Sequence, residues 1–358
     1  MSDKPELKDP ATPTMERCIT SYPVRRRFRP GVVFPPQVPG VEGVIDIHCH
    51  AHQGQQDALA VTKLASQNGM GGLLFKTIGG FKEEYRPGRQ VARVRDELHR
   101  WADQTGTTPC GCWAGFGITI DNTPPTVAKL RQSIADGISA VWMPVFNHAI
   151  SLHKVGGLEM WWDASANSNQ HSEPLPWELA LKYGYYSLDE RGRLKPLIEE
   201  LIRIVADSGL ALFFGHATHP EIFAYAELLD KLNCKRGVVD HPFSPFIDLS
   251  IEQMRQLAAL GVTLNFTYDE LSPLLGVDPL RMYEAIRAVG VDHVTLSSDV
   301  GDPLLPNSVE AMRQIRNYMA AFGLNAQELD VVCRDNPARI VGPERVYAGA
   351  AGTLQGPA

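Results

Sequence analysis

Several features that would direct this chain of 358 residues toward other functions are scarce or absent. No apolar run is long enough to span a bilayer, and the first residues lack the apolar segment of a signal peptide, so we expect a soluble, cytoplasmic protein. The only basic cluster is Arg25-Arg26-Arg27, and the net charge is −7, which argues against nucleic-acid and membrane partners. The six cysteines are scattered, as expected for reduced thiols rather than a disulfide framework.

A dinucleotide-binding turn is also missing, because no Gly-x-Gly-x-x-Gly sequence follows any apolar run. Hydrophobic residues make up 44% of the chain and charged residues 21%, which is typical of a globular enzyme and excludes general disorder. The length suits one large barrel or two medium domains.

Short apolar runs alternate with amphipathic stretches along most of the chain. The predicted strands are 44–48, 72–76, 112–118, 140–143, 210–214, 237–240, 262–266 and 294–298. Predicted helices follow nearly all of them, at 57–68, 88–104, 126–136, 194–208, 220–232, 251–260, 279–289, 308–322 and 326–332. This alternation predicts an α/β protein with a (β/α)₈ TIM barrel over residues 41–342. The alternative is a doubly wound open sheet, which the missing glycine-rich turn disfavours.

Three segments depart from the alternation of strands and helices. Residues 1–40 are rich in proline and predict an extended arm on the body or across a partner subunit. The insertion at 145–190, after the fourth strand, is long for a structureless loop and predicts a functional lid. Residues 343–358 are rich in Gly and Ala and predict a mobile tail.

The first strand ends in a pair of histidines, His48 and His50, in the sequence Asp46-Ile47-His48-Cys49-His50. Alternate residues of a strand face the same side, so we expect both imidazoles on one face, with Asp46 beneath them and Cys49 opposite. Two imidazoles on one face form half of a transition-metal site.

Other strands also end in polar residues that bind metals or transfer protons. They are Lys76 after the second strand, His216 after the fifth, His241 after the sixth and Asp299 after the eighth. In a parallel barrel, the carboxyl ends of the strands meet at one rim, where active sites lie. The sequence therefore predicts a metal site at this rim.

The set resembles the amidohydrolase superfamily, which has His-x-His on strand one, single histidines on strands five and six, and an aspartate on strand eight. The segment Asn336-Pro337-Ala338-Arg339-Ile340-Val341-Gly342 is similar to the closing helix of metal-dependent hydrolases and decarboxylases of that group. The resemblance implies that His48 and His50 bind the more buried metal, with Asp299 close to it as the general base. It implies that His216 and His241 bind a second metal, or that His216 completes a single site while His241 polarises the substrate.

Two-metal members of the superfamily usually bridge the ions with a carboxylated lysine or a glutamate from strand four, and this chain has Met143-Pro144 there. The site then holds one ion, or Lys76 supplies a carboxylated bridge. Lys76 could instead pair with Asp46 or Asp299, or contact an anionic substrate. Zinc is the expected metal, although manganese and iron also accept this ligand set.

Four further residues are predicted to contact substrate. His52 is expected in the loop after the first strand, and Arg86 could anchor a substrate carboxylate, although such arginines are more often solvated. Trp161 and Trp162 would give flat walls for an aromatic or heterocyclic substrate, or else bury the insertion's own core or a dimer contact.

The resemblance implies a metal-dependent hydrolase of a small-molecule amide, cyclic amide, imide or lactone. The alternative is a metal-dependent non-oxidative decarboxylase similar to aminocarboxymuconate-semialdehyde decarboxylase. A barrel that only retains a metal is the third reading, which the complete ligand set disfavours. We also expect a homo-oligomer.

Overall fold

A computed structural model describes residues 40–52, 54–79, 85–118, 125–145, 148–156 and 173–342. The chain divides into two compact units, Met1–Val38 and Pro39–Ala358, and all described residues belong to the second. Nearly all of the predicted arm, the predicted tail, and Trp161 and Trp162 lie outside the described residues.

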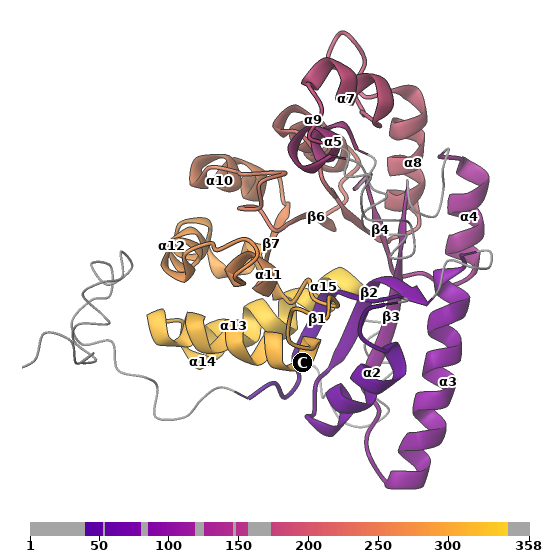
Figure 1. Ribbon diagram of the computed structural model, residues 1–358, viewed down its shortest axis with the longest axis vertical. Helices are drawn as coiled ribbons and strands as arrows, with labels where there is room; N and C mark the ends of the chain where they lie inside the picture. The colour runs from indigo at the N-terminus through magenta and orange to yellow at the C-terminus, as the bar shows by residue number, and fades with distance from the viewer. Residues whose placement is uncertain are drawn as a thin grey trace, which may run out of the picture. The chain divides into compact units, whose positions relative to one another are not determined.

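Eight parallel strands form one sheet in sequence order, which confirms the predicted (β/α)₈ barrel (Figure 1). The strands are β1 (Ile45–His52), β2 (Gly72–Gly79), β3 (Gly111–Gly117), β4 (Ala140–Trp142), β5 (Ala211–Phe213), β6 (Gly237–Asp240), β7 (Thr263–Thr267) and β8 (Val294–Ser297). The first and last strands meet at their carboxyl ends, where Asp299 N donates to His48 O at 2.7 Å and His50 N donates to Val300 O at 2.8 Å.

Helices connect consecutive strands, as the amphipathic stretches predict. The longer ones are α2 (Ala58–Gln67), α3 (Pro87–Thr105), α4 (Val127–Ala135), α8 (Pro196–Asp207), α9 (His219–Lys231), α10 (Ile251–Ala259), α12 (Pro279–Val289) and α13 (Ser308–Phe322). The shorter ones are α5 (Ala149–Val155), α7 (Trp177–Tyr183), α11 (Tyr268–Leu271), η2 (Val291–His293), α14 (Ala326–Asp330), η3 (Val331–Asp335) and α15 (Asn336–Val341). Side-chain caps start several of them: Asp57 accepts from Ala60 N, and Ser250 begins a capping box.

The barrel interior is filled by an apolar cluster distinct from the larger one between sheet and helices. Its members include Ile45, Ile47, Leu74, Trp113, Trp142, Phe213, Val238, Ile340 and Val341. Trp142 stacks on Phe213 with ring centroids 4.1 Å apart, and a Cβ atom at Gly115 would lie 2.0 Å from the Trp142 ring. The predicted closing helix is α15, whose Ile340 and Val341 belong to this cluster. Polar side chains therefore collect at the opposite, carboxyl end.

Strand β1 is irregular, and this changes which side chains face inward. Its pairing with β2 shifts between Asp46 and Cys49 and again between Cys49 and His50. Ile47 belongs to the interior cluster and Cys49 to the outer one, while the ring of His48 lies 5.6 Å from that of Trp142. Two consecutive side chains therefore face inward, which strict alternation does not allow.

The structure corrects one predicted boundary and adds two helices within the predicted insertion. β1 extends to His52, which pairs with Gly79, so the prediction that His52 lies in a loop is wrong. The described part of the insertion holds α5 and α7, with a small core of Ala149, Leu152 and Ala180 against which Trp177 and Tyr186 pack. Tyr186 therefore contributes to the insertion's own core. No helix among the described residues is long and apolar enough to cross a membrane.

Candidate metal centre

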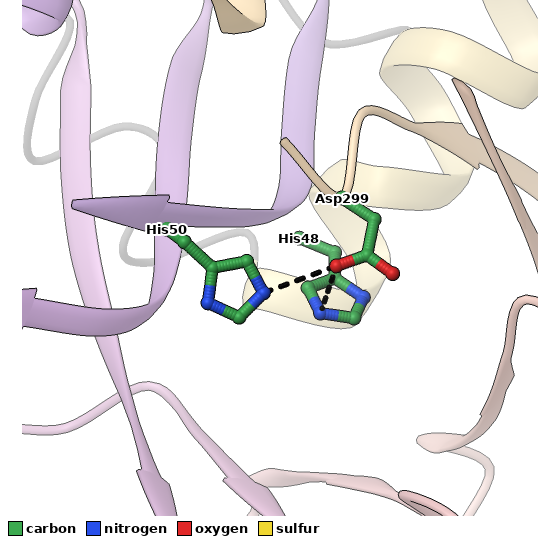
Figure 2. Close-up of side chains that lie close together, drawn as sticks. All are labelled: His48, His50 and Asp299. Atoms are coloured by element: carbon green, nitrogen blue, oxygen red, sulfur yellow. Dashed lines mark hydrogen bonds and ion pairs between the residues drawn. The ribbon is translucent and has the colours of Figure 1, made fainter. Parts of the chain in front are cut away.

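Three side chains from the two ends of the barrel sequence converge at its carboxyl rim (Figure 2). Asp299 Oδ1 lies 3.0 Å from His48 Nε2 and 3.0 Å from His50 Nε2. One ligand atom from each residue lies within 4.8 Å of the others, and in the part of the chain that the structure describes no other group of three His, Cys, Asp or Glu residues does so. The structure thus brings together three of the residues that the sequence placed at the rim.

The three residues fit a divalent metal ion. Ligand atoms bonded to one ion at about 2.1 Å are about 3.0–3.4 Å apart, which matches the two contacts to Asp299. Both ring nitrogens of His48 are buried and make no well-aligned hydrogen bond, although each lies near a carboxylate oxygen. Zinc, manganese and iron all accept imidazole nitrogens together with a carboxylate oxygen as ligands.

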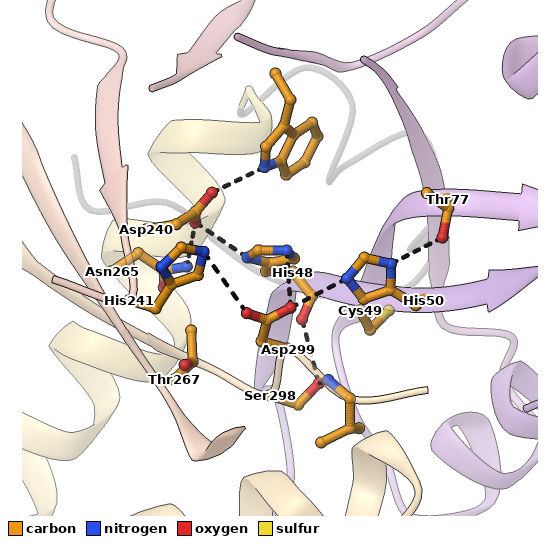
Figure 3. A network of polar contacts seen from close by, with 12 residues as sticks. His48, Cys49, His50, Thr77, Asp240, His241, Asn265, Thr267, Ser298 and Asp299 are labelled. Atoms are coloured by element: carbon orange, nitrogen blue, oxygen red, sulfur yellow. Dashed lines mark hydrogen bonds and ion pairs between the residues drawn. The ribbon is translucent and has the colours of Figure 1, made fainter. Parts of the chain in front are cut away.

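Asp240 holds His48 from the other side of the ring (Figure 3). Its Oδ1 lies 3.1 Å from His48 Nδ1 and accepts from Asn265 Nδ2 at 2.9 Å, while Oδ2 accepts from Trp142 Nε1 at 2.8 Å. Burial raises the pKa of Asp240, but the charge of His48 and its contact with Asp240 outweigh burial, and the pKa is lowered overall. Asp240 is therefore an ionised acceptor that favours a proton on His48 Nδ1 and a lone pair on Nε2.

His50 is oriented by Thr77, whose Oγ1 lies 2.8 Å from His50 Nδ1. A hydroxyl both donates and accepts, so Thr77 is compatible with either tautomer of His50. Without an ion, His50 Nε2–H donates to Asp299; with a proton on Nδ1 instead, Nε2 presents its lone pair to the same place.

His216 and His241 lie beside the three-residue cluster without joining it. Their ring centroids are 5.2 Å apart, and His241 Nε2 lies 3.9 Å from Asp299 Oδ2. Ser151 Oγ donates to Val145 O at 2.7 Å and so accepts from His216 Nδ1 at 2.8 Å, which places the lone pair of His216 on Nε2.

The electrostatics of the cluster separate one histidine from the others. Burial lowers the pKa of His50 and His241 to about 4 and holds that of His216 well below its usual value, so these three imidazoles are neutral and able to act as ligands. Burial also acts on His48, but the charges of Asp240 and Asp299 raise its pKa to about 9. A cation is thus favoured at His48, either as a proton or as a metal ion.

Asp299 is ionised and held in a strained backbone conformation. Burial raises its pKa, but the charge of His48, its close contact with Asp299 and the hydrogen bond from His50 hold the pKa well below the usual range. Its φ is +51° and that of His241 is +32°, two of the four described non-glycine residues with positive φ. Such conformations persist where the surrounding structure fixes them, and they are concentrated at functional sites.

Strand alternation predicted that Asp46 lies beneath the two histidines, and the structure shows that this is wrong. The Asp46 carboxylate accepts from Ser298 N at 3.0 Å, from Ser298 Oγ and from His48 N at 3.1 Å. Burial raises its pKa to about 6. Asp46 therefore ties β1 to the segment that carries Asp299, and the irregularity of β1 is the reason for its different position.

Two further charged groups lie near the cluster. Lys76 on β2 is 4% exposed, and it makes no ion pair with Asp46 or Asp299. Asp269, at the start of α11, donates its N–H to Ser298 O at 3.1 Å. Burial, with the charge of Asp299, raises the pKa of Asp269 to about 7.

Of the four residues predicted to contact substrate, the structure describes the side chain of Arg86 alone. The guanidinium of Arg86 makes an ion pair with Asp136, with Nη2 2.6 Å from Oδ1, so it is held in a contact within the protein. The side chain of His52, with Trp161 and Trp162, lies outside the described residues. Their roles stay predictions.

Sequence reasoning missed three residues that orient the histidines: Asp240, Thr77 and Ser151. Asp240 gave a signal, since it is a carboxylate at the end of a buried strand directly before His241. Thr77 and Ser151 gave none, because a hydroxyl within an apolar strand or an insertion is common.

Comparisons with known proteins agree with the fold. An amidohydrolase from Pseudomonas aeruginosa matches with a TM-score of 0.50 and 11% identity, over 86% of this chain and 97% of that one. The probable dipeptidase PvdM from Pseudomonas aeruginosa matches with a TM-score of 0.50 and 13% identity, over 86% and 96%. At these identities the matches support the barrel fold and no more. A family of unknown function, DUF6282, matches residues 125–265, and no curated protein matches.

Proposed function

We propose that the protein is a metal-dependent hydrolase acting on a C–N or C–O bond of a small molecule, such as an amide, a cyclic amide, an imide or a lactone. The observation that carries this proposal is the convergence of His48, His50 and Asp299 at the carboxyl rim of the barrel. The proposed substrate is small because the centre lies at the buried rim of a barrel, and its proposed aromatic or heterocyclic character rests on the sequence alone.

His48, His50 and Asp299 would hold the ion, with zinc proposed and manganese or iron as alternatives. His216 would complete this site, or would form a second one with His241. An ion bound there would lower the pKa of a coordinated water and polarise a substrate carbonyl. The strained backbone at Asp299 and His241 supports a functional rather than a purely structural role.

Asp299 is the proposed general base. Its Oδ1 faces the two histidines, whereas Oδ2 lies 3.9 Å from His241 Nε2, so Oδ2 is the oxygen that would take a proton and return it to the leaving group. His241 is neutral near pH 7, and its Nδ1 contacts Ser244 Oγ at 2.9 Å, so the ring is held in place. We propose that His241 positions the substrate carbonyl.

A second candidate is a metal-dependent non-oxidative decarboxylase. Two observations favour it: the described residues hold one clustered ligand set, and the end of β4 offers no bridging carboxylate. Carbon dioxide release from a carboxylate substrate, without hydrolysis of amides or lactones, would establish this reaction instead.

The Asp299→Asn variant tests the proposed chemistry. The amide retains the size of the side chain but not its charge or basicity, so we expect turnover of an amide and lactone panel to fall about 100-fold or more. Metal content by elemental analysis should be measured for the same samples. The matched control is Asp292→Asn. Asp292 is an exposed carboxylate on η2, which precedes β8, whereas the rim lies at the carboxyl end of that strand. Retained metal with near-normal turnover in Asp299→Asn would exclude Asp299 as the base.

A further inference from the structure

Lys76 is a buried lysine near the metal centre. It shares the inward face of β2 with Leu74, which belongs to the interior cluster, and only 4% of its surface is exposed. Among the residues that the structure describes, none forms a hydrogen bond or ion pair with its ammonium group. The ammonium therefore has three N–H donors and no acceptor from the described protein.

The charge of Lys76 acts on the same space as the metal ligands. Burial is the main cause of the lowered pKa values of His50, His216 and His241, and the positive charge of Lys76 lowers all three further. These histidines come from β1 and from the segments after β5 and β6, so the charge of Lys76 acts on ligands from three parts of the rim.

The side chain of Lys76 is almost entirely buried, and an ammonium group in such surroundings is costly without an acceptor, because its charge and its N–H donors lose most of their hydration. A structural lysine at such a place would pair with a nearby carboxylate. Asp240 is instead occupied by Trp142, Asn265 and His48, and Asp299 by His48 and His50. Neither carboxylate is therefore free to pair with Lys76, and no other described residue takes their place.

We propose that Lys76 binds a carboxylate group of the substrate, so that the proposed enzyme acts on small carboxylate-bearing molecules. This inference rests on the proposed function, because it places the substrate at the same centre. A single lysine matches a monoanion, whereas a phosphate dianion is usually held by several donors. The other candidate cation, Arg86, is held by Asp136.

Binding of small carboxylates to the metal-loaded full chain tests the inference without turnover. Acetate and benzoate would be titrated by calorimetry, with acetamide and benzamide as uncharged analogues of the same shape. The variant is Lys76→Met, which keeps the length of the side chain and removes the charge. Lys129→Met, an exposed lysine on α4, is the matched control.

We expect the Kd of both carboxylates to rise about tenfold or more in Lys76→Met, with no change for the amides and none in Lys129→Met. Metal content should be unchanged, and Lys76→Met should unfold at the same or a higher temperature, since it removes an unpaired buried charge. A structural ion pair would give the opposite thermal shift. Equal carboxylate affinity in the wild type and Lys76→Met would overturn the inference.

Two other results would also overturn it. One is tighter Lys76-dependent binding of inorganic phosphate than of acetate and benzoate. The other is a carboxylated Lys76, seen as a bicarbonate-dependent second metal ion per chain and a mass increase of one carbon dioxide in the native protein. If no metal binds at all, the proposed function fails; if metal binds and amides are hydrolysed without Lys76-dependent carboxylate affinity, only the inference fails.

Discussion

Asp240 and His48 form a fully buried pair at the centre of the barrel, with Asp240 Oδ1 3.1 Å from His48 Nδ1. The opposite ring nitrogen, Nε2, lies 3.0 Å from Asp299. A carboxylate behind a ligating histidine fixes the tautomer and increases the basicity of the ligating nitrogen. The pair therefore explains why His48 is prepared to bind an ion at Nε2.

Replacing Asp240 by Asn should weaken metal binding about 10–100-fold. The amide keeps an acceptor but loses the charge that favours a proton on His48 Nδ1. The measurement is the metal Kd by competition with a chelator. Asp230→Asn, which removes a surface pair with Lys235, is the control and should leave the Kd unchanged. An unchanged Kd in Asp240→Asn would show that Asp240 has only a packing role.

Ser151→Ala should reduce turnover about tenfold without loss of the ion held by His48, His50 and Asp299. The hydroxyl comes from α5 in the insertion and orients His216, so its loss leaves His216 Nδ1 without that acceptor. The measurement is kcat together with metal content. Ser208→Ala, which removes a hydroxyl bonded to Ile204 O, is the control. A normal kcat in Ser151→Ala would show that the contact between the insertion and His216 does not affect turnover.

Glu270 should make stability depend on pH. Burial raises its pKa from 4.5 to about 8, so between these values the folded state holds one proton more than the unfolded state. The free energy of unfolding therefore falls as pH rises through this window, by about 1.4 kcal/mol per pH unit from this group.

The Glu270→Gln variant removes this pH dependence. It should be less stable than the wild type at pH 5, because Phe243 N and Thr267 N both donate to the carboxylate, and the deficit should shrink toward pH 8. Urea unfolding between pH 5 and pH 8 measures the difference in the free energy of unfolding between variant and wild type. Glu284→Gln, at an exposed position, is the control. A deficit that stays constant or grows with pH would contradict the assignment.

Glu221→Ala should lower the free energy of unfolding by about 3–5 kcal/mol, because it leaves buried donors without an acceptor. The carboxylate accepts from His148 Nε2 at 2.9 Å, from Ser187 N at 2.7 Å and from Thr218 N at 2.9 Å, and so joins α9 to the insertion. Urea unfolding measures the loss, and Glu227→Ala on the exposed face of the same helix is the control. A loss below about 1 kcal/mol would mean that the insertion folds without this contact.

The sequence by itself determined the barrel and most of the rim. Short apolar runs separated by amphipathic helices give eight βα units, and in a parallel barrel every strand end lies at the same rim. His48, His50 and Asp299 could therefore be placed together although 249 residues separate His50 from Asp299.

Only the tertiary structure decided which groups touch. The shifted pairing of β1 turns both Ile47 and His48 inward and moves Asp46 to Ser298, and no local pattern marks that shift. Asp240 behind His48, Ser151 behind His216 and Asp136 beside Arg86 are contacts between segments distant in the chain. The physical reason is that periodicity encodes the faces of an element, whereas hydrogen-bond partners depend on strand register and helix packing, which the whole fold sets.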